Sequence, residues 1–165
     1  MKAPWWTAPL GLGAIVAIAI GSTVAPKGER LLGSYSTTLQ DRTPAQRHNA
    51  ELALTHLRKV VIRPGEIFSF NKTIGTFTRD AGYRRAPVSF NGQLISTWGG
   101  GVCQTSTTVY NAALLAGMQI LERNRHRFAP GYVPIGLDAA VAYDSIDLRF
   151  KNPYKQDVRI EAEVK

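Results

Sequence analysis

The sequence predicts an α+β domain in which two main helices pack on a mostly antiparallel sheet, with a cysteine at the N-terminus of the second helix. Two stretches have helical character: residues 44–59 carry apolar residues at helical spacing, and a run from Val102 to Gly117 contains no breaker. Short segments rich in β-branched and alternating apolar residues flank both stretches, and turn residues separate them. Helices and strands grouped in this way are typical of an α+β fold.

The first predicted helix has a well-marked start. Thr43 is a suitable N-cap residue, and Pro44 fits the first helical position, where its missing N–H costs nothing. A strand is expected just before it, at residues 31–39. The apolar face of this helix then consists of residues three or four positions apart: Ala50, Ala53, Leu54 and Leu57.

The second predicted helix follows a run of three glycines, Gly99–Gly101, and continues to Gly117. Its apolar residues form two adjacent stripes, one of Val109, Ala113 and Ala116 and the other of Cys103, Tyr110, Leu114 and Gly117. Residues 71–97 are expected to form loops and short strands. Further strands are predicted before and after this region, at residues 60–62, 67–70, 128–133, 139–143, 146–150 and 158–164.

Composition limits the classes of function. The chain has 165 residues, 44% hydrophobic and 19% charged, which suits one globular domain with a real core. Its net charge of +8 favours anionic surroundings, although the charges are dispersed. No nucleic-acid-binding module is recognisable, so we expect no nucleic-acid partner.

The N-terminus, residues 1–30, has the character of a signal peptide or membrane anchor followed by a linker, with the domain proper at 31–165. No charge occurs between Lys2 and Lys27, and residues 10–20 are strongly apolar. A cut before Ser22 would follow a small-x-small pattern. The uncharged stretch also reaches the roughly 20 residues needed to span a bilayer. We therefore expect an exported protein of the cell envelope, either secreted or membrane-associated through residues 5–25; a buried N-terminal helix is the alternative.

Cys103 is the only cysteine in the chain. A disulfide framework and a thiolate-rich zinc site are thereby excluded, and no phosphate-binding loop is present, so we expect no metal and no cofactor. At the start of a helix, backbone N–H groups and the helix dipole stabilise a thiolate and a developing oxyanion. Gly100 and Gly101 would let a substrate approach the helix closely. The alternative is an inert, buried thiol.

A thiol nucleophile needs a base, and the chain has three histidines. His48 and His56 lie on the first predicted helix and are interpreted as surface or packing residues. His126 follows the helix that begins at Cys103, so the chain can turn back and bring it near the thiol. Because His126 lies between two arginines, an exposed turn is the alternative.

A third group would orient the imidazole. Asp138 lies twelve residues after His126, and adjacent antiparallel strands could place its carboxylate beside the ring. Asp144 and Asp147 are competing candidates. The order Cys, His, Asp, with the cysteine at a helix N-terminus, is similar in architecture to transglutaminase-like and papain-like hydrolases.

Four segments of the sequence closely resemble the VanW family, and the resemblance covers roughly residues 31–165. The family's members are typically exported or anchored bacterial envelope proteins. Some have been linked to cysteine-dependent LD-transpeptidases, which cross-link peptidoglycan stem peptides between two diaminopimelate-type residues. The segments are GEIFSFNKTIG at 65–75, GGGVCQTSTTVYNAALLAG at 99–117, ERNRHRFAPGYVPIGLDAAVAY at 122–143 and DLRFKNPY at 147–154.

The resemblance implies a catalytic set of Cys103, His126 and Asp138, with peptidoglycan stem peptides as partners. The function expected from it is a cysteine acyltransferase that cross-links stem peptides. The alternative is a non-catalytic peptidoglycan-binding or glycopeptide-resistance accessory module. Residues expected to form the oxyanion hole or to contact substrate lie in or just before the matched helix: Gly100, Gly101, Gln104, Thr105 and Tyr110.

Overall fold

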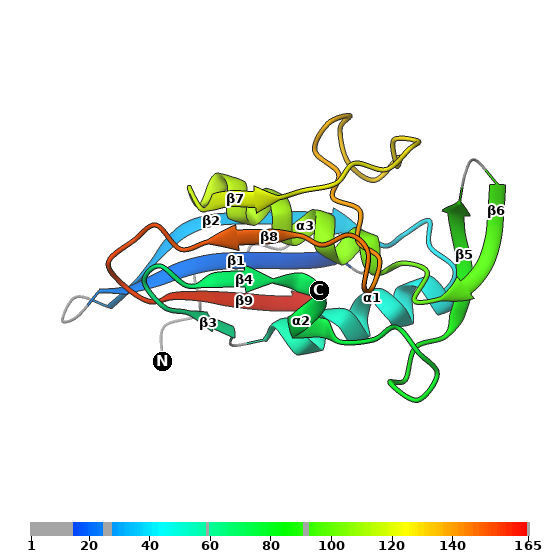
Figure 1. Ribbon diagram of the computed structural model, residues 1–165, viewed down its shortest axis with the longest axis horizontal. Helices are drawn as coiled ribbons and strands as arrows, with labels where there is room; N and C mark the ends of the chain where they lie inside the picture. The colour runs from blue at the N-terminus through cyan, green and yellow to red at the C-terminus, as the bar shows by residue number, and fades with distance from the viewer. Residues whose placement is uncertain (1–14, 25–27, 59, 91–92, 165) are drawn as a thin grey trace.

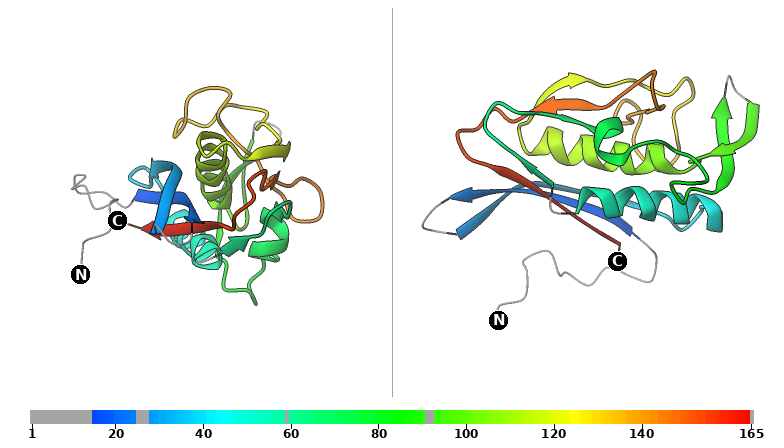
Figure 2. Two further views of the ribbon diagram at one scale, coloured as in Figure 1. Left: turned by 90° about the vertical axis from the view of Figure 1, so that its left-hand side faces the viewer. Right: turned by 60° about the horizontal axis from the view of Figure 1, so that its bottom comes forward.

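The computed structural model describes residues 15–24, 28–58, 60–90 and 93–164. Its largest element is an antiparallel four-stranded sheet, and two long helices lie against that sheet (Figure 1). A smaller sheet lies beyond α3, so that in the right-hand view of Figure 2 α3 lies between the two sheets. The predicted α+β class is confirmed, with several small antiparallel sheets in place of one. The four-stranded sheet has the order β2-β1-β9-β3, with β1 at Ile15–Val24, β2 at Gly28–Thr38, β3 at Val60–Ile62 and β9 at Val158–Val164.

The sheet begins earlier in the chain than the expected domain start at residue 31. Strand β1 pairs with both β2 and β9, although it falls within the segment interpreted as a signal peptide or anchor. Residues 1–14 lie outside the described part of the chain. Among the described residues, no helix has the length and apolar character needed to cross a bilayer. Export and membrane association stay predictions.

Helix α1 spans Pro44–Leu57 and begins as predicted. The side chain of Thr43 accepts a hydrogen bond from the backbone N–H of Gln46, and the Gln46 side chain accepts one from the Thr43 N–H. This reciprocal capping satisfies two N–H groups that a helix start leaves without partners. The four predicted apolar residues of α1 are fully buried, and they face α3 and β9.

Helix α3 spans Val102–Leu115 and contains an unusual number of buried polar residues. Val109 and Ala113 join the main hydrophobic core, as the apolar pattern predicts, and so does Ala112. The polar side chains are equally inaccessible, and buried polar groups require hydrogen-bond partners. They are Gln104, Thr105, Ser106, Thr107, Thr108 and Asn111.

The remaining elements correct several sequence expectations. A second sheet has the order β4-β8-β7, with β4 at Ile67–Ser69, β8 at Arg149–Lys151 and β7 at Gln119–Glu122. Strand β7 and the short helix α2, Phe70–Ile74, were not predicted. Strands β5, Arg85–Phe90, and β6, Gln93–Trp98, form a hairpin that extends from one end of the body in Figure 1.

The chain between β7 and β8 is mostly loop. The strands predicted at 128–133 and 139–143 are wrong, and the predicted strand at 146–150 is reduced to its last two residues, which begin β8. In this part of the described chain, β-pairing is limited to two isolated bridges, Asn124 with Ala140 and Ala142 with Ile146. The segment is apolar enough for strands, but side chains of α3 bind much of its backbone instead.

Candidate functional site

The glycine turn before α3 packs closely against α1 and the start of β5. The Asn49 side chain on α1 donates to the carbonyl oxygens of Arg84 and Gly100, both at 2.8 Å, and accepts from the Arg84 N–H at 2.8 Å. A Cβ on Gly100 would lie 2.7 Å from the Ala86 carbonyl oxygen. Gly101 has φ of 111°, a conformation that side chains disfavour. The glycines are therefore required by packing, and this contact fixes where α3 begins.

Cys103 is the second residue of α3 and is half-buried. Its Sγ donates to the Val141 carbonyl oxygen at 3.4 Å, which brings the thiol against the loop that precedes β8. The Gln104 N–H already donates to the Gly101 carbonyl at 3.0 Å. Among the described residues of this turn, the Cys103 N–H makes no backbone hydrogen bond, as is usual for the first N–H groups of a helix.

His126 and Asp138 lie together, as the sequence predicts. The Asp138 Oδ2 atom lies 2.7 Å from His126 Nδ1 and accepts a second hydrogen bond, at 2.6 Å, from the His126 backbone N–H. This double contact fixes both the position of the histidine and the orientation of its ring. With Nδ1 occupied by the carboxylate, Nε2 is the ring nitrogen available to the thiol. The two residues belong to loops and not to the expected neighbouring strands.

The electrostatics of His126 reflect both neighbours. Burial alone would lower the pKa of the imidazole, but a side-chain hydrogen bond and charge interaction with Cys103 raise it, and so do those with Asp138. The net effect holds the pKa of His126 above its ordinary value of 6.5. Burial would raise the pKa of Asp138, but its hydrogen bonds to His126 and the charges of His126 and Arg123 lower it. Cys103 and Asp138 therefore both influence the protonation of His126.

Arg123 holds the other side of the carboxylate, a contact that sequence reasoning missed. Its Nη2 lies 2.9 Å from Asp138 Oδ1, and its Nε donates to the Asp138 carbonyl at 2.6 Å. The same Nη2 also donates to Gly136 O at 2.8 Å, and the guanidinium lies over the Tyr110 ring at 5.5 Å. The carboxylate of Asp138 is only 5% exposed, with the Arg123 cation on one side and the His126 ring on the other.

Helix α3 holds the backbone around Asp138 with its buried polar side chains. Asn111 Nδ2 donates to the Leu137 carbonyl at 2.7 Å. Thr107 Oγ1 accepts from the Ala139 N–H at 3.0 Å, and Ser106 Oγ donates to the Ala139 carbonyl at 2.6 Å. One helix therefore positions both the thiol and the carboxylate. The sequence did contain a signal for this: a polar stripe on an otherwise apolar helix needs partners.

The residues predicted to form the oxyanion hole or contact substrate are mostly used internally. Gln104 is 2% exposed; its amide donates to the Thr38 carbonyl at 2.7 Å and accepts from Arg42 Nε at 2.8 Å. Thr105 is fully buried and donates to the Ala50 carbonyl at 3.0 Å. Tyr110 lies beneath the Arg123 guanidinium. These side chains build the site's scaffold.

Tyr132 and Arg42 add a further layer beside the thiol. The Arg42 guanidinium lies 4.7 Å from the centre of the Tyr132 ring. Burial and the charge of Cys103 raise the pKa of Tyr132 far above its ordinary range, so its hydroxyl stays protonated and can donate a hydrogen bond. Neither residue was predicted: Arg42 lies just before the first predicted helix, and Tyr132 lies in a segment interpreted as a strand.

The competing candidates lie elsewhere. His48 lies 2.9 Å from the Gly82 carbonyl oxygen, and His56 is exposed on α1. Asp147 is engaged by Ser69, Asn71 and Leu148, not by the imidazole. Among the described residues, no three His, Cys, Asp or Glu side chains are grouped so as to hold a metal ion.

The half-buried thiol and the His126–Asp138 pair lie within the part of the chain that a family model covers. Residues 45–165 match the family model described as VanW like protein, and the chain belongs to this family. It is 40% identical over 131 residues to the "Uncharacterized protein YoaR" of Bacillus subtilis (strain 168), covering 79% of this chain and 43% of that protein. It is 31% identical over 109 residues to the "Vancomycin B-type resistance protein VanW" of Enterococcus faecalis (strain ATCC 700802 / V583), covering 63% of this chain and 40% of that protein.

The chain spans about two fifths of the length of these two relatives, at 43% and 40%. No solved structure matches it.

Proposed function

We propose that this protein is an exported, cell-envelope cysteine acyltransferase that acts on peptidoglycan stem peptides. The observation that carries the proposal is the position of His126, whose Nδ1 is held 2.7 Å from Asp138 Oδ2 and whose pKa is raised by Cys103. Nucleophile, base and orienting group in this order are the parts that acyl transfer through a thioester requires. The net charge of +8 supports an anionic polymer as the surrounding medium.

In the acylation step, His126 Nε2 takes the proton of the Cys103 thiol. The sulfur then attacks the carbonyl carbon before the terminal D-alanine of a tetrapeptide stem. As the tetrahedral intermediate collapses, the carbon–nitrogen bond breaks and His126 gives its proton to the leaving amine. The products are a thioester on Cys103 and free D-alanine. Asp138 remains ionised throughout and keeps the ring in the correct tautomer.

In the second step, the amine of another stem attacks the thioester carbon. His126 takes a proton from that amine, a new amide bond forms, and the carbon–sulfur bond breaks to regenerate the thiol. Water in place of the amine would give hydrolysis. The Cys103 N–H is the backbone donor that stabilises the oxyanion in both steps, since the Gln104 N–H is committed to Gly101.

Intact-mass spectrometry of the protein incubated with a synthetic tetrapeptide stem tests the proposal. The expected result is a covalent adduct whose mass equals the stem minus D-alanine, together with release of D-alanine. Cys103→Ala removes the nucleophile and should abolish both signals. Asp157→Asn, an exposed carboxylate change, is the matched control and should leave both intact. Unchanged D-alanine release by Cys103→Ala would overturn the proposal.

A non-catalytic peptidoglycan-binding or glycopeptide-resistance accessory module is the second candidate. It is favoured by the contact between Cys103 Sγ and the Val141 carbonyl, because a thiol that donates to a carbonyl has a structural role as well. This candidate predicts that Cys103→Ser binds stem peptide as tightly as the unaltered protein and that no adduct forms. The same mass experiment therefore separates the two candidates.

A further inference from the structure

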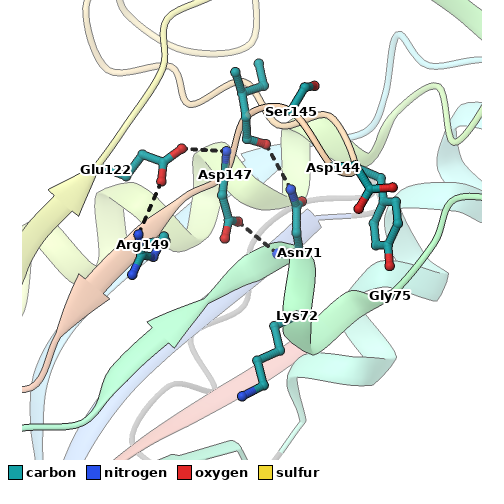
Figure 3. Close-up of a pocket in the computed structure, with 10 residues that line it drawn as sticks. Asn71, Lys72, Gly75, Glu122, Asp144, Ser145, Asp147 and Arg149 are labelled. Atoms are coloured by element: carbon teal, nitrogen blue, oxygen red, sulfur yellow. Dashed lines mark hydrogen bonds and ion pairs between the residues drawn. The ribbon is translucent and has the colours of Figure 1, made fainter.

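A cavity of about 610 Å³ is lined in part by residues 143–147, which follow the Val141 carbonyl that receives the Cys103 thiol (Figure 3). Its lining comes from α2, β7, β8 and the turn before β8: Asn71, Lys72, Gly75, Glu122, Tyr143, Asp144, Ser145, Ile146, Asp147 and Arg149. Three of these residues are acidic and two are basic. The cavity is therefore locally acidic on a protein whose overall charge is +8. That sign favours a cationic ligand group.

Two of the acidic residues are already committed to the walls. Asp147 accepts hydrogen bonds at 2.9 Å from the Asn71 N–H and at 2.8 Å from the Leu148 N–H. Glu122 Oε1 accepts from the Asp147 N–H at 2.8 Å, and its Oε2 lies 3.8 Å from Arg149 Nη1. These bonds join α2, β7 and β8 into one rigid frame. They also leave Asp144 as the carboxylate that can serve a ligand.

Asp144 has no recorded hydrogen bond or ion pair with any described residue, and it is exposed at the cavity. It is also the non-glycine residue of the described chain with a positive φ, 64°. In Figure 3, the Asn71 side chain lies between Asp147 and Asp144. Its Nδ2 is fixed by the carbonyls of Ala142 and Ile146, at 3.1 and 2.9 Å, so Oδ1 faces away from them. That oxygen is buried and accepts no hydrogen bond from any described residue.

The cavity is tied to the thiol by two routes. Asp144 lies three residues after Val141, whose carbonyl receives the Cys103 thiol, and three residues span at most about 10 Å. The Tyr143 ring packs edge-on against Phe77 with centroids 6.4 Å apart, and Phe77 in turn packs on Gly99 of the glycine turn. A peptide acylating Cys103 would thus have a side chain within reach of Asp144.

We propose that this cavity binds a primary ammonium group on the side chain of the peptide substrate, with Asp144 as the contacting carboxylate. The proposal rests on the proposed function for the identity of the peptide, but its test does not require catalysis. Asp144→Asn is the informative substitution. Asparagine tolerates the left-handed conformation and keeps the size of the side chain, while the charge is removed.

The experiment measures binding by calorimetry in a Cys103→Ala background, which cannot form a thioester. Two synthetic tetrapeptides are compared: one with a free side-chain amine on its third residue, and one with that amine acetylated. We expect the free amine to bind roughly tenfold more tightly, as for a charge-assisted hydrogen bond, and Asp144→Asn to remove this preference. Asp157→Asn, at an exposed site elsewhere, should retain it.

Equal binding of the two peptides, or a preference that survives Asp144→Asn, overturns the inference. Calcium chloride is titrated alone as a further arm. If calcium binds, displaces the amine and no longer binds to Asp144→Asn, the cavity is a metal site. That result also overturns the inference. Failure of thioester formation in the unaltered protein would affect the proposed function and leave this result standing.

Discussion

Replacing Asp138 with asparagine should destabilise the protein although the two side chains have nearly the same shape. The carboxylate accepts three hydrogen bonds: two on Oδ2 from His126 and one on Oδ1 from Arg123. An asparagine side chain has one acceptor oxygen and one donor nitrogen. In either orientation its NH₂ group faces a donor, and the Arg123 cation also loses its ion pair. Such a conflict cannot be relieved by rotating the amide.

The magnitude follows from the burial of the groups. A hydrogen bond to a charged group contributes about 1.5–3 kcal/mol, and breaking a fully buried pair costs about 3–5 kcal/mol. Asp138 is 5% exposed and Arg123 is 23% exposed, so solvent recovers part of the loss. We expect the free energy of unfolding to fall by about 3 kcal/mol at pH 6. Urea unfolding followed by circular dichroism measures it, with Asp157→Asn expected to change it by less than about 0.5 kcal/mol.

The difference between the unaltered protein and Asp138→Asn should depend on pH in a defined way. The pKa of Asp138 is lowered from 3.8, so its contribution to stability is present above that value and is lost as pH falls through the folded pKa. The pKa of His126 is raised from 6.5, so its contribution is present below 6.5 and is lost as pH rises through the folded pKa. The difference should peak between about pH 4 and 6.5. A difference that is absent, or that is unchanged from pH 3 to pH 9, would refute the reasoning.

Two further substitutions test how the site is built. Gly101→Ala places a Cβ against the α1 backbone at a positive φ and should lower the free energy of unfolding by about 3 kcal/mol. Gly131→Ala, with open space around it, should change that free energy by at most about 1 kcal/mol. Equal effects of the two substitutions would contradict the close packing of the glycine turn. Asn111→Ala removes the hydrogen bond that holds the backbone before Asp138 and should lower the free energy of unfolding by about 2 kcal/mol. It should also alter the histidine chemical shifts in NMR spectra. Leu114→Ala, at an exposed position on the same helix, should leave those shifts unchanged. Histidine shifts that Asn111→Ala leaves unmoved would contradict the role assigned to α3.

The long helices could be predicted because their signals are local. Thr43 and Pro44 specify a helix start through their own hydrogen bonding and backbone geometry, and α1 begins there. The run after Gly101 contains no residue that ends a helix, and α3 begins at Val102. Both signals act within a few residues, so no knowledge of the tertiary structure is needed to use them.

The loop that carries Asp138 could not be predicted in the same way. Residues 139–143 have the composition of a strand, but the Ala139 backbone binds Thr107 and Ser106 on α3, not a neighbouring strand. His126 and Asp138 meet as expected, although the reasoning from adjacent strands was wrong. Arg123 escaped notice because a single arginine among several basic residues carries no pattern that marks it as buried.

The central claim is that Cys103 and His126 form one reactive pair. The most direct measurement is the rate at which iodoacetamide alkylates Cys103 in the folded protein at pH 7, compared with His126→Gln. An imidazole that takes the thiol proton should make alkylation of the unaltered protein at least roughly tenfold faster. Equal rates in the two folded proteins would contradict the claim, and Cys103 would then be a packing residue at the start of α3.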